Sequence, residues 1–132
     1  MNRWLVKTDP EGYSFADLLR EGTTRWEGVK NALALRHMRG MARGDEVLVY
    51  ETGAVKAVVG TATVAKAPYP DPKAKDPLIV VVDLRAGKPM RAPVTLAAAK
   101  ADPALRDSPL VRMGRLSVMP VTDAQWTRLR GE

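Results

Sequence analysis

The chain has 132 residues, 45% of them hydrophobic and 27% charged, which is typical of one globular domain and excludes extended disorder or two separate cores. It has no cysteine, so disulfides and thiolate metal sites are excluded, and with no apolar run of bilayer length we expect a cytoplasmic protein without membrane contact. Lys and Arg exceed Asp and Glu by 21 to 15, and this net charge of +6 favours polyanionic partners, although dispersed basic residues serve solubility equally well.

The first third of the chain predicts a short strand followed by two helices. Residues 4–6 are apolar, and the Asp-Pro-Glu-Gly sequence at 9–12 has the turn chemistry to end the strand. Ser14 and Asp17 have the spacing of a capping box, and Gly22 ends the helix that they begin. We expect the segment that follows to be a loop, residues 23–31, leading into a second helix with one apolar face, residues 32–41.

The remainder alternates β-prone segments with turn-forming ones. Prolines within residues 68–77 exclude regular structure there, because each fixes φ and removes a backbone donor. Thr122 is expected to cap a last helix that buries Trp126. The predicted strands are residues 46–50, 57–64, 78–84 and 116–121, with a turn at 87–89 and an alanine-rich helix ending at 102–103. Strands with long connections and helices gathered early and late predict an α+β fold, either a mixed sheet or a small barrel.

The segment around Trp26 combines residue types that suit a planar ligand. Trp26 stands beside Gly28 in a polar, turn-forming stretch, where Gly permits close backbone approach. A tryptophan offers a flat π-surface, and Asn31 has both a donor and an acceptor on one amide. Together with nearby lysines, these groups suit a nucleobase attached to a phosphate backbone.

Basic residues cluster in the segment that follows Trp26, which makes them candidates for phosphate contacts. A second cluster, Arg106, Arg112 and Arg115, could flank the same groove. The phosphate-contact candidates are Lys30, Arg36, Arg39 and Arg43.

Several motifs in order resemble the EVE domain family of the PUA-like superfamily. The resemblance implies one domain over residues 1–132, built as a small mixed PUA-like β-barrel with peripheral helices. The chain differs from the usual family pattern at three places. The family usually has Glu at the position of Asp9, Arg at that of Lys30, and His-Ser at that of Glu51-Thr52. The segments that carry the resemblance are 4–10, 13–14, 26–31, 38–41, 44–50 and 116–118.

The resemblance also places a ligand pocket at the Trp26 loop. Lys7 and Thr8 would form one wall and Tyr50 and Thr52 the other, while Ser117 is equally suited to a ligand contact or a structural hydroxyl. With Trp26 and Asn31, these residues are the predicted base pocket. No cofactor and no metal is expected.

The resulting hypothesis is a monomeric, non-catalytic reader of a modified base, with modified cytosine in DNA as the ligand that the family resemblance implies. A base inside a duplex cannot offer both faces and its pairing edge to a protein, so it would have to be flipped or already unpaired. Trp26 would stack on the base, and the other pocket residues would contact its polar edges or bound the pocket.

Three alternatives stay open at this level. An RNA-binding module has the same residue requirements apart from a contact to the 2′-hydroxyl. A small metal-dependent nucleotide hydrolase would need Asp71, Asp76 or Asp83 to converge, and the single histidine, His37, excludes a histidine metal cluster. A protein-interaction adaptor could use a sheet edge.

Overall fold

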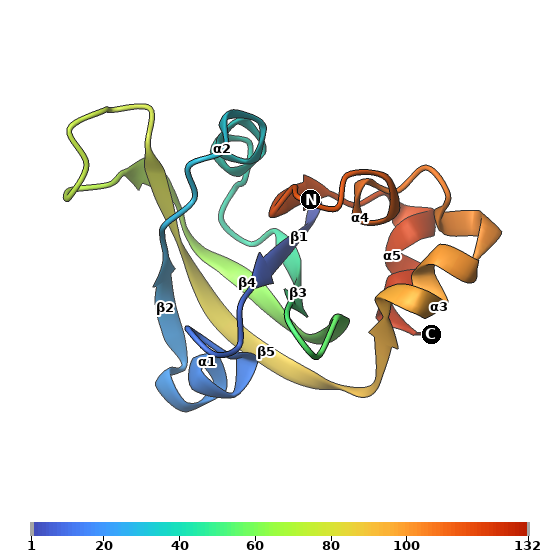
Figure 1. The fold of residues 1–132 in the computed structure, drawn as a ribbon. Coiled ribbons are helices and arrows are strands. Elements are labelled where there is room, and N and C mark those ends of the chain that lie inside the picture. The colour runs from blue at the N-terminus through green and yellow to red at the C-terminus, as the bar shows by residue number, and fades with distance from the viewer. Residues whose placement is uncertain (1, 132) are drawn as a thin grey trace.

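A six-stranded mixed sheet organises the molecule, as seen in the computed structural model, which describes residues 2–131 (Figure 1). The strand order is β2-β5-β4-β3-β1-β6. β1 runs parallel to β3, and all other neighbouring strands are antiparallel. The strands are β1 (Arg3–Thr8), β2 (Thr23–Trp26), β3 (Glu46–Glu51), β4 (Ala57–Pro70), β5 (Val80–Thr95) and β6 (Val118–Pro120).

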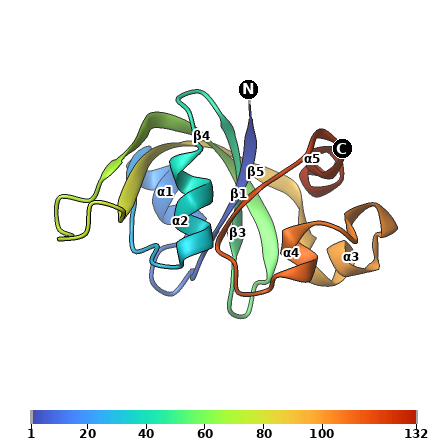
Figure 2. The same ribbon diagram turned by 90° about the horizontal axis from the view of Figure 1, so that it is seen from above.

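Short helices surround this sheet in two groups. Figures 1 and 2 show the first two helices beside the end of the sheet that contains β2, and the last three gathered at the opposite side, where β5 ends. The helices are α1 (Phe15–Glu21), α2 (Ala32–Arg39), α3 (Leu96–Ala101), the 3-10 turn η1 (Pro103–Leu105), α4 (Pro109–Arg112) and α5 (Asp123–Arg130). No helix within residues 2–131 is long and apolar enough to cross a membrane.

The predicted α+β class is confirmed, but the sheet is not closed into a barrel. It begins at β2 and ends at β6, and no strand pairing joins these two edges within residues 2–131. β6 has only three residues and pairs with β1 alone, so it ends the sheet early. The chain thus forms a curved, open sheet.

Local capping chemistry confirms several helix boundaries. The Ser14 hydroxyl accepts from Asp17 N at 3.0 Å, the Asp17 carboxylate accepts from Ser14 N at 2.9 Å, and Gly22 follows the end of α1. Thr122 and Gln125 form the same reciprocal pair at the start of α5. These caps depend on residues three apart in sequence, which is why the pattern alone predicts them.

The predicted loop at 23–31 is partly wrong, because residues 23–26 form β2 against β5. The predicted proline-rich loop is also wrong in part, because β4 continues to Pro70. Pro68 lies where the β4–β5 register shifts, and Pro70 closes the pairing opposite Val80, so the prolines sit at a bulge and a strand end.

The turn predicted at 87–89 is wrong as well, because β5 continues through it with a register shift. Thr61 Oγ1 accepts from Lys88 N at 3.0 Å, which satisfies a donor that the bulge leaves outside the regular ladder. A Cβ on Gly87 would lie 2.3 Å from that hydroxyl, so only glycine fits here without a shift of the neighbouring strand.

One close approach across the core depends on a second glycine. Phe15, at the start of α1, is buried with its ring against Gly60 of β4, beside a shift in strand register. An ideal Cβ at position 60 would lie 2.2 Å from Phe15 Cζ. The contact therefore joins α1 to the middle of the sheet.

Gly60→Ala should lower the free energy of unfolding by about 1–3 kcal/mol, because the buried Phe15 ring has to leave its place. Urea unfolding followed by circular dichroism measures this. Gly114→Ala is the control, since a Cβ there meets nothing within 4 Å. Equal stability of the two variants would contradict the packing described.

Candidate nucleic-acid interface

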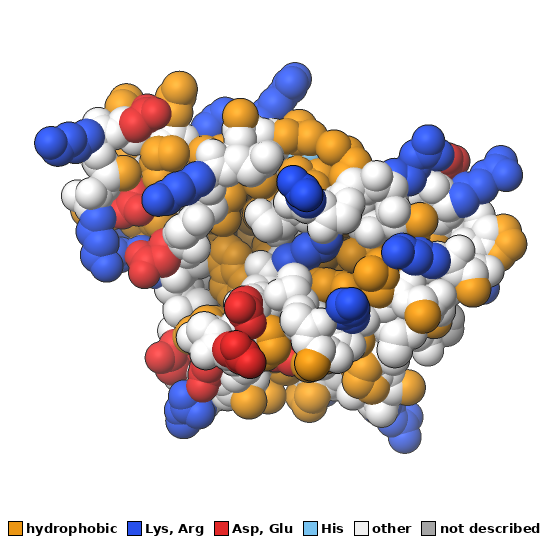
Figure 3. Space-filling model, in the orientation of Figure 1, with side chains coloured by type: hydrophobic (Ala, Val, Ile, Leu, Met, Phe, Trp, Pro, Cys, Tyr) orange, Lys and Arg blue, Asp and Glu red, His pale blue; other side chains and the backbone are white. Residues whose placement is uncertain are grey.

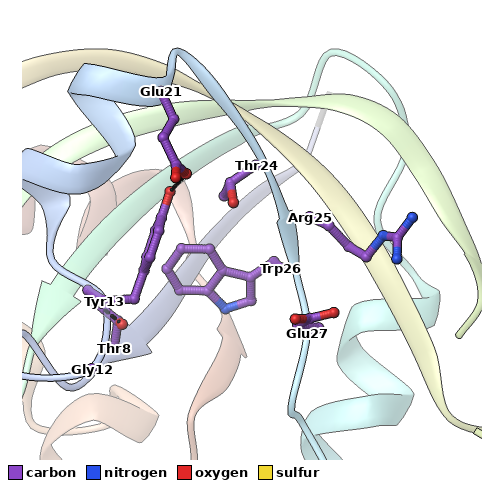
Figure 4. Close-up of a pocket in the computed structure, with 8 residues that line it drawn as sticks. All are labelled: Thr8, Gly12, Tyr13, Glu21, Thr24, Arg25, Trp26 and Glu27. Atoms are coloured by element: carbon purple, nitrogen blue, oxygen red, sulfur yellow. Dashed lines mark hydrogen bonds between the residues drawn. The ribbon is translucent and has the colours of Figure 1, made fainter. Parts of the chain in front are cut away.

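A pocket of about 370 Å³ opens beside Trp26, at the end of β2 (Figure 4). In Figure 3 a hollow with a hydrophobic floor opens on this face of the molecule. We call the cavity beside Trp26 the Trp26 pocket. Its volume lies within the roughly 300–1,000 Å³ common for small-ligand sites. It is lined by Thr8, Gly12, Tyr13, Glu21, Thr24, Arg25, Trp26 and Glu27.

Trp26 forms an aromatic wall of this pocket. Its side chain is 7% exposed, and its ring meets Tyr13 edge-on, with centroids 6.2 Å apart and planes at 85°. The Trp26 indole N–H has no hydrogen-bond partner among residues 2–131, whereas the Trp4 indole N–H donates to Asp45 at 2.9 Å. Trp26 therefore combines a mostly packed ring with one unused donor.

Tyr13 is held at both ends. The Thr8 hydroxyl donates to Tyr13 O at 2.6 Å, and the Tyr13 hydroxyl donates to Glu21 at 2.5 Å (Figure 4). Partial burial, followed by the bond to Glu21, raises the pKa of the Tyr13 phenol. The tyrosine is thus a protonated donor, and its ring supports Trp26 in place.

Two of the three charged residues that line the Trp26 pocket are acids. Glu21 and Glu27 contribute carboxylates, and Glu27 lies 3.9 Å from Lys73 Nζ in a long, exposed ion pair. Arg25 is turned toward another group, because its Nε donates to the Tyr69 hydroxyl at 3.3 Å. Carboxylates are acceptors only, so the pocket can receive amino groups of a ligand.

Strand alternation sends Lys7 and Thr8 to opposite faces of β1. Thr8 lines the Trp26 pocket, while Lys7 lines a second hollow of about 220 Å³, which we call the lysine pocket. Tyr50 pairs with Lys7 in the parallel register and shares its face, with the Lys7 ammonium 5.4 Å from the ring centroid. Thr52 lines the same hollow, and its N–H donates to Thr8 O at 2.9 Å.

Asn31 and Ser117 have structural contacts of their own. The Asn31 side chain caps α2 by accepting from Ala34 N at 3.0 Å, and it lines a third hollow beside Arg112 and Arg115. Ser117 accepts from Lys7 N through its backbone oxygen at 2.9 Å. The seven residues predicted for the base pocket are therefore divided: Thr8 and Trp26 line the first hollow, and the others line or support its neighbours.

The predicted phosphate contacts lie on and around α2. Lys30, Arg36 and Arg43 are exposed, and none of the three has an ion pair within the described part of the chain. Arg39 is exposed too, but it donates to Leu78 O at 3.0 Å and so anchors the loop between β4 and β5. These side chains give α2 a positively charged outer face.

The three aspartates considered for a hydrolase site make local contacts instead. Asp71 accepts from Lys73 N and Asp76 from Leu78 N, both at 2.9 Å, as in Asx turns. Asp83 accepts from the Tyr69 hydroxyl at 2.7 Å. Residues 2–131 contain no group of three or more His, Asp or Glu side chains arranged to hold a metal ion.

Several lining residues were not predicted from the sequence. Glu21 and Thr24 reach the Trp26 pocket because α1 and β2 lie beside it, and residues 23–26 were predicted to be a loop. Tyr13 was not predicted as a lining residue either, although it belongs to a segment that carries the family resemblance. Lys56 and Lys100 of the lysine pocket come from segments with no distinguishing local pattern.

An open mixed sheet with a pocket beside Trp26 at one strand end defines a small α+β domain with a candidate ligand site. The family model described as "EVE domain" matches residues 2–131. The chain therefore belongs to the EVE domain family, as its motifs indicated, and its architecture is the PUA-like one.

Solved structures and curated relatives agree with this membership. An NMR structure of a Rhodopseudomonas palustris protein is similar with a TM-score of 0.93 and 40% identity, covering 98% of this chain and 91% of that one. Human thymocyte nuclear protein 1, crystallised with DNA containing 5-methylcytosine, is similar with a TM-score of 0.88 and 25% identity, covering 100% and 99%. Rat thymocyte nuclear protein 1 is 33% identical over 82 residues, 53% of this chain and 36% of that protein, so the match spans about a third of the rat protein.

The edge-on contact between Tyr13 and Trp26 should contribute about 0.5–1.5 kcal/mol of coupling energy to folding. Urea unfolding of Tyr13→Ala, Trp26→Ala and the double variant measures it. Tyr13→Ala combined with Trp126→Ala is the control. We expect their effects to add, because Tyr13 lies just before α1 and Trp126 lies on α5, and these helices are on opposite sides of the fold (Figure 1). If the changes in unfolding free energy add for the Tyr13/Trp26 pair as they do for the control pair, Tyr13 does not support Trp26.

Burial lowers the pKa of Lys7, so the folded state disfavours its charged form. The free-energy cost of burying the charged ammonium is fully present below the lowered pKa. It disappears as the pH rises from there toward the pKa of lysine in the unfolded chain, about 10.4. The stability of the wild type relative to Lys7→Met should therefore increase between pH 7 and about pH 10. Urea titrations over this range test the sign, with the exposed Lys75→Met as the control. An unchanged difference would contradict the desolvation of Lys7.

Proposed function

We propose that the chain is a non-catalytic nucleic-acid-binding module that recognises a modified base, with modified cytosine in DNA as its ligand. The observation that carries the proposal is the Trp26 pocket, a hollow of suitable size with an aromatic wall, in a chain related over its full length to a protein crystallised with 5-methylcytosine DNA. The charge of +6 supports a polyanionic partner.

The chemistry of the pocket favours cytosine over thymine. 5-Methylcytosine and thymine carry the same methyl group, but cytosine has an amino donor where thymine has a carbonyl acceptor. The carboxylates of Glu21 and Glu27 accept hydrogen bonds from an amino group and repel a carbonyl oxygen. The unused Trp26 N–H offers a donor to an acceptor on the base or its sugar-phosphate.

A base can use this pocket only when it is outside the double helix, so recognition requires a flipped or unpaired base. Trp26 supplies the aromatic contact, and because it is only 7% exposed, stacking on its full face requires a small opening of the pocket. Lys30, Arg36, Arg39 and Arg43 on the α2 side are proposed to contact flanking phosphates. The earlier prediction that Lys7, Asn31, Tyr50, Thr52 and Ser117 contact the base stays a prediction.

The function is tested by fluorescence anisotropy at constant salt. The probes are single-stranded and duplex DNA, and matching RNA, each carrying one cytosine, 5-methylcytosine or thymine (uracil in RNA). We expect tightest binding to 5-methylcytosine in DNA. Trp26→Ala should weaken it roughly tenfold or more, because base stacking on an aromatic side chain is worth ~1–3 kcal/mol. Trp26→Phe keeps a ring but removes the N–H, and should have an intermediate effect.

The same assay tests the acidic lining. Glu27→Gln should reduce the preference for 5-methylcytosine over thymine, whereas Glu11→Gln, an exposed acid outside the pocket, should leave it unchanged while altering the net charge equally. Equal binding of every oligonucleotide by folded wild type and Trp26→Phe would reject base recognition. A preference for RNA would assign the module to RNA.

A further inference from the structure

Three lysines from distant parts of the chain line the lysine pocket. Lys7 lies near the end of β1, Lys56 immediately precedes β4, and Lys100 lies in the last turn of α3. Thr52 also lines the lysine pocket, with its hydroxyl donating to Thr8 O at 3.4 Å, and among residues 2–131 no Asp or Glu side chain lines this hollow. The charge assembled there is therefore entirely positive.

None of the three lysines has a carboxylate partner. No ion pair of Lys7, Lys56 or Lys100 occurs within residues 2–131. The Lys7 ammonium donates to Gly114 O at 3.0 Å, which holds it in place without neutralising it. Burial of this charge also lowers the pKa of Lys7, in agreement with a site that lacks a counter-charge.

Lys56 is held in a costly backbone conformation. Its φ is +48°, and among residues 2–131 no other residue except glycine has a positive φ. A non-glycine residue is disfavoured in this region because its Cβ crowds the following carbonyl oxygen. The Lys56 carbonyl accepts from Leu96 N at 2.8 Å, which ties this turn to the start of α3. The strained turn thus places Lys56 beside the helix that carries Lys100.

We propose that the lysine pocket is a phosphate-binding site. Lysines bind phosphate as point charges with up to three donors each, and a hydroxyl adds a further hydrogen bond. The phosphate that binds there has two possible sources: the backbone of a bound DNA strand, or a free phosphate or phosphorylated small molecule. Only the first source rests on the proposed function.

The position of the site relative to the Trp26 pocket favours a strand phosphate. Thr8 lines one hollow and its neighbour Lys7 the other, on opposite faces of the same strand end. Thr52 N donates to Thr8 O at 2.9 Å, so a lining residue of one hollow is bonded to a lining residue of the other at this strand end. In the proposed arrangement, a strand whose base occupies the Trp26 pocket crosses the end of β1 and brings a neighbouring phosphate to the lysines.

The test uses the double variant Lys56→Gln/Lys100→Gln, in which both side chains are exposed and removable without a core defect. The slope of log affinity against log salt concentration for DNA should fall by about 1.4–1.8, the value for two lost phosphate contacts. Lys88→Gln/Arg91→Gln is the matched control, with the same charge change at exposed positions of β5 outside the pocket. Its slope should stay close to that of the wild type.

A second measurement does not depend on DNA. Inorganic phosphate is titrated into ¹⁵N-labelled protein at constant ionic strength, with chloride as the reference, and the amide shifts of Thr52, Gly53 and Lys56 are followed. Saturable shifts that are lost in Lys56→Gln/Lys100→Gln and retained in the control establish the site. If they occur while the DNA salt slope is unchanged, the phosphate comes from a small molecule rather than from the strand.

The inference is overturned if phosphate gives no saturable shifts, even when the salt slope falls, because the lysines then act only through diffuse charge. Its failure is distinct from that of the proposed function. Base selectivity with no phosphate response rejects only the lysine pocket, and saturable phosphate binding without any DNA binding rejects only the base reader.

Discussion

The buried carboxylate of Asp45 is the interaction on which the arrangement of this fold depends. It is 3% exposed and accepts from the Trp4 indole at 2.9 Å, from Ala42 N at 2.9 Å and from Asn2 N at 3.2 Å. These bonds join the start of β1 to the turn that precedes β3. A parallel pair has no tight hairpin turn to set its register, so a side chain that binds both strand starts does this work instead. The paired polar groups also avoid the penalty of burial without partners.

The parallel register then determines what lies at the other end of the two strands. Arg3 pairs with Glu46 at one end and Thr8 with Glu51 at the other. Lys7 and Tyr50 are opposite each other on one face, while Thr8 lies on the other face beside the Trp26 pocket. A single strand end thus supplies two hollows of different chemistry, one acid-lined and aromatic, the other basic.

Unpaired positive charge occurs in both regions that are proposed to contact phosphates, the lysine pocket and the surface around α2. Many surface charges are partnered, such as Arg128 with Asp102 at 2.7 Å and Arg3 with Asp123 at 3.1 Å, both on or next to α5. The lysines of the lysine pocket and several basic residues around α2 have no carboxylate partner within the described residues. An uncompensated positive charge attracts a polyanion at long range, whereas a paired one does so only weakly. Lys88 and Arg91 of β5 also have no ion pair within residues 2–131, so the proposed contact faces are distinguished by their pockets as well as by their charge.

The sequence by itself determined the class of fold, the family and the capped helices, because these rest on residues close together in the chain. It could not determine that residues 23–26 form a strand, that Pro68 and Gly87 sit in bulges of β4 and β5, or that the sheet stays open, because strand pairing is decided between distant segments. Nor could it separate Lys7 from Thr8 into different hollows, or bring Lys56 and Lys100 beside Lys7. Only the tertiary structure decides which side chains share a cavity, since that depends on strand register and on the face to which each residue points.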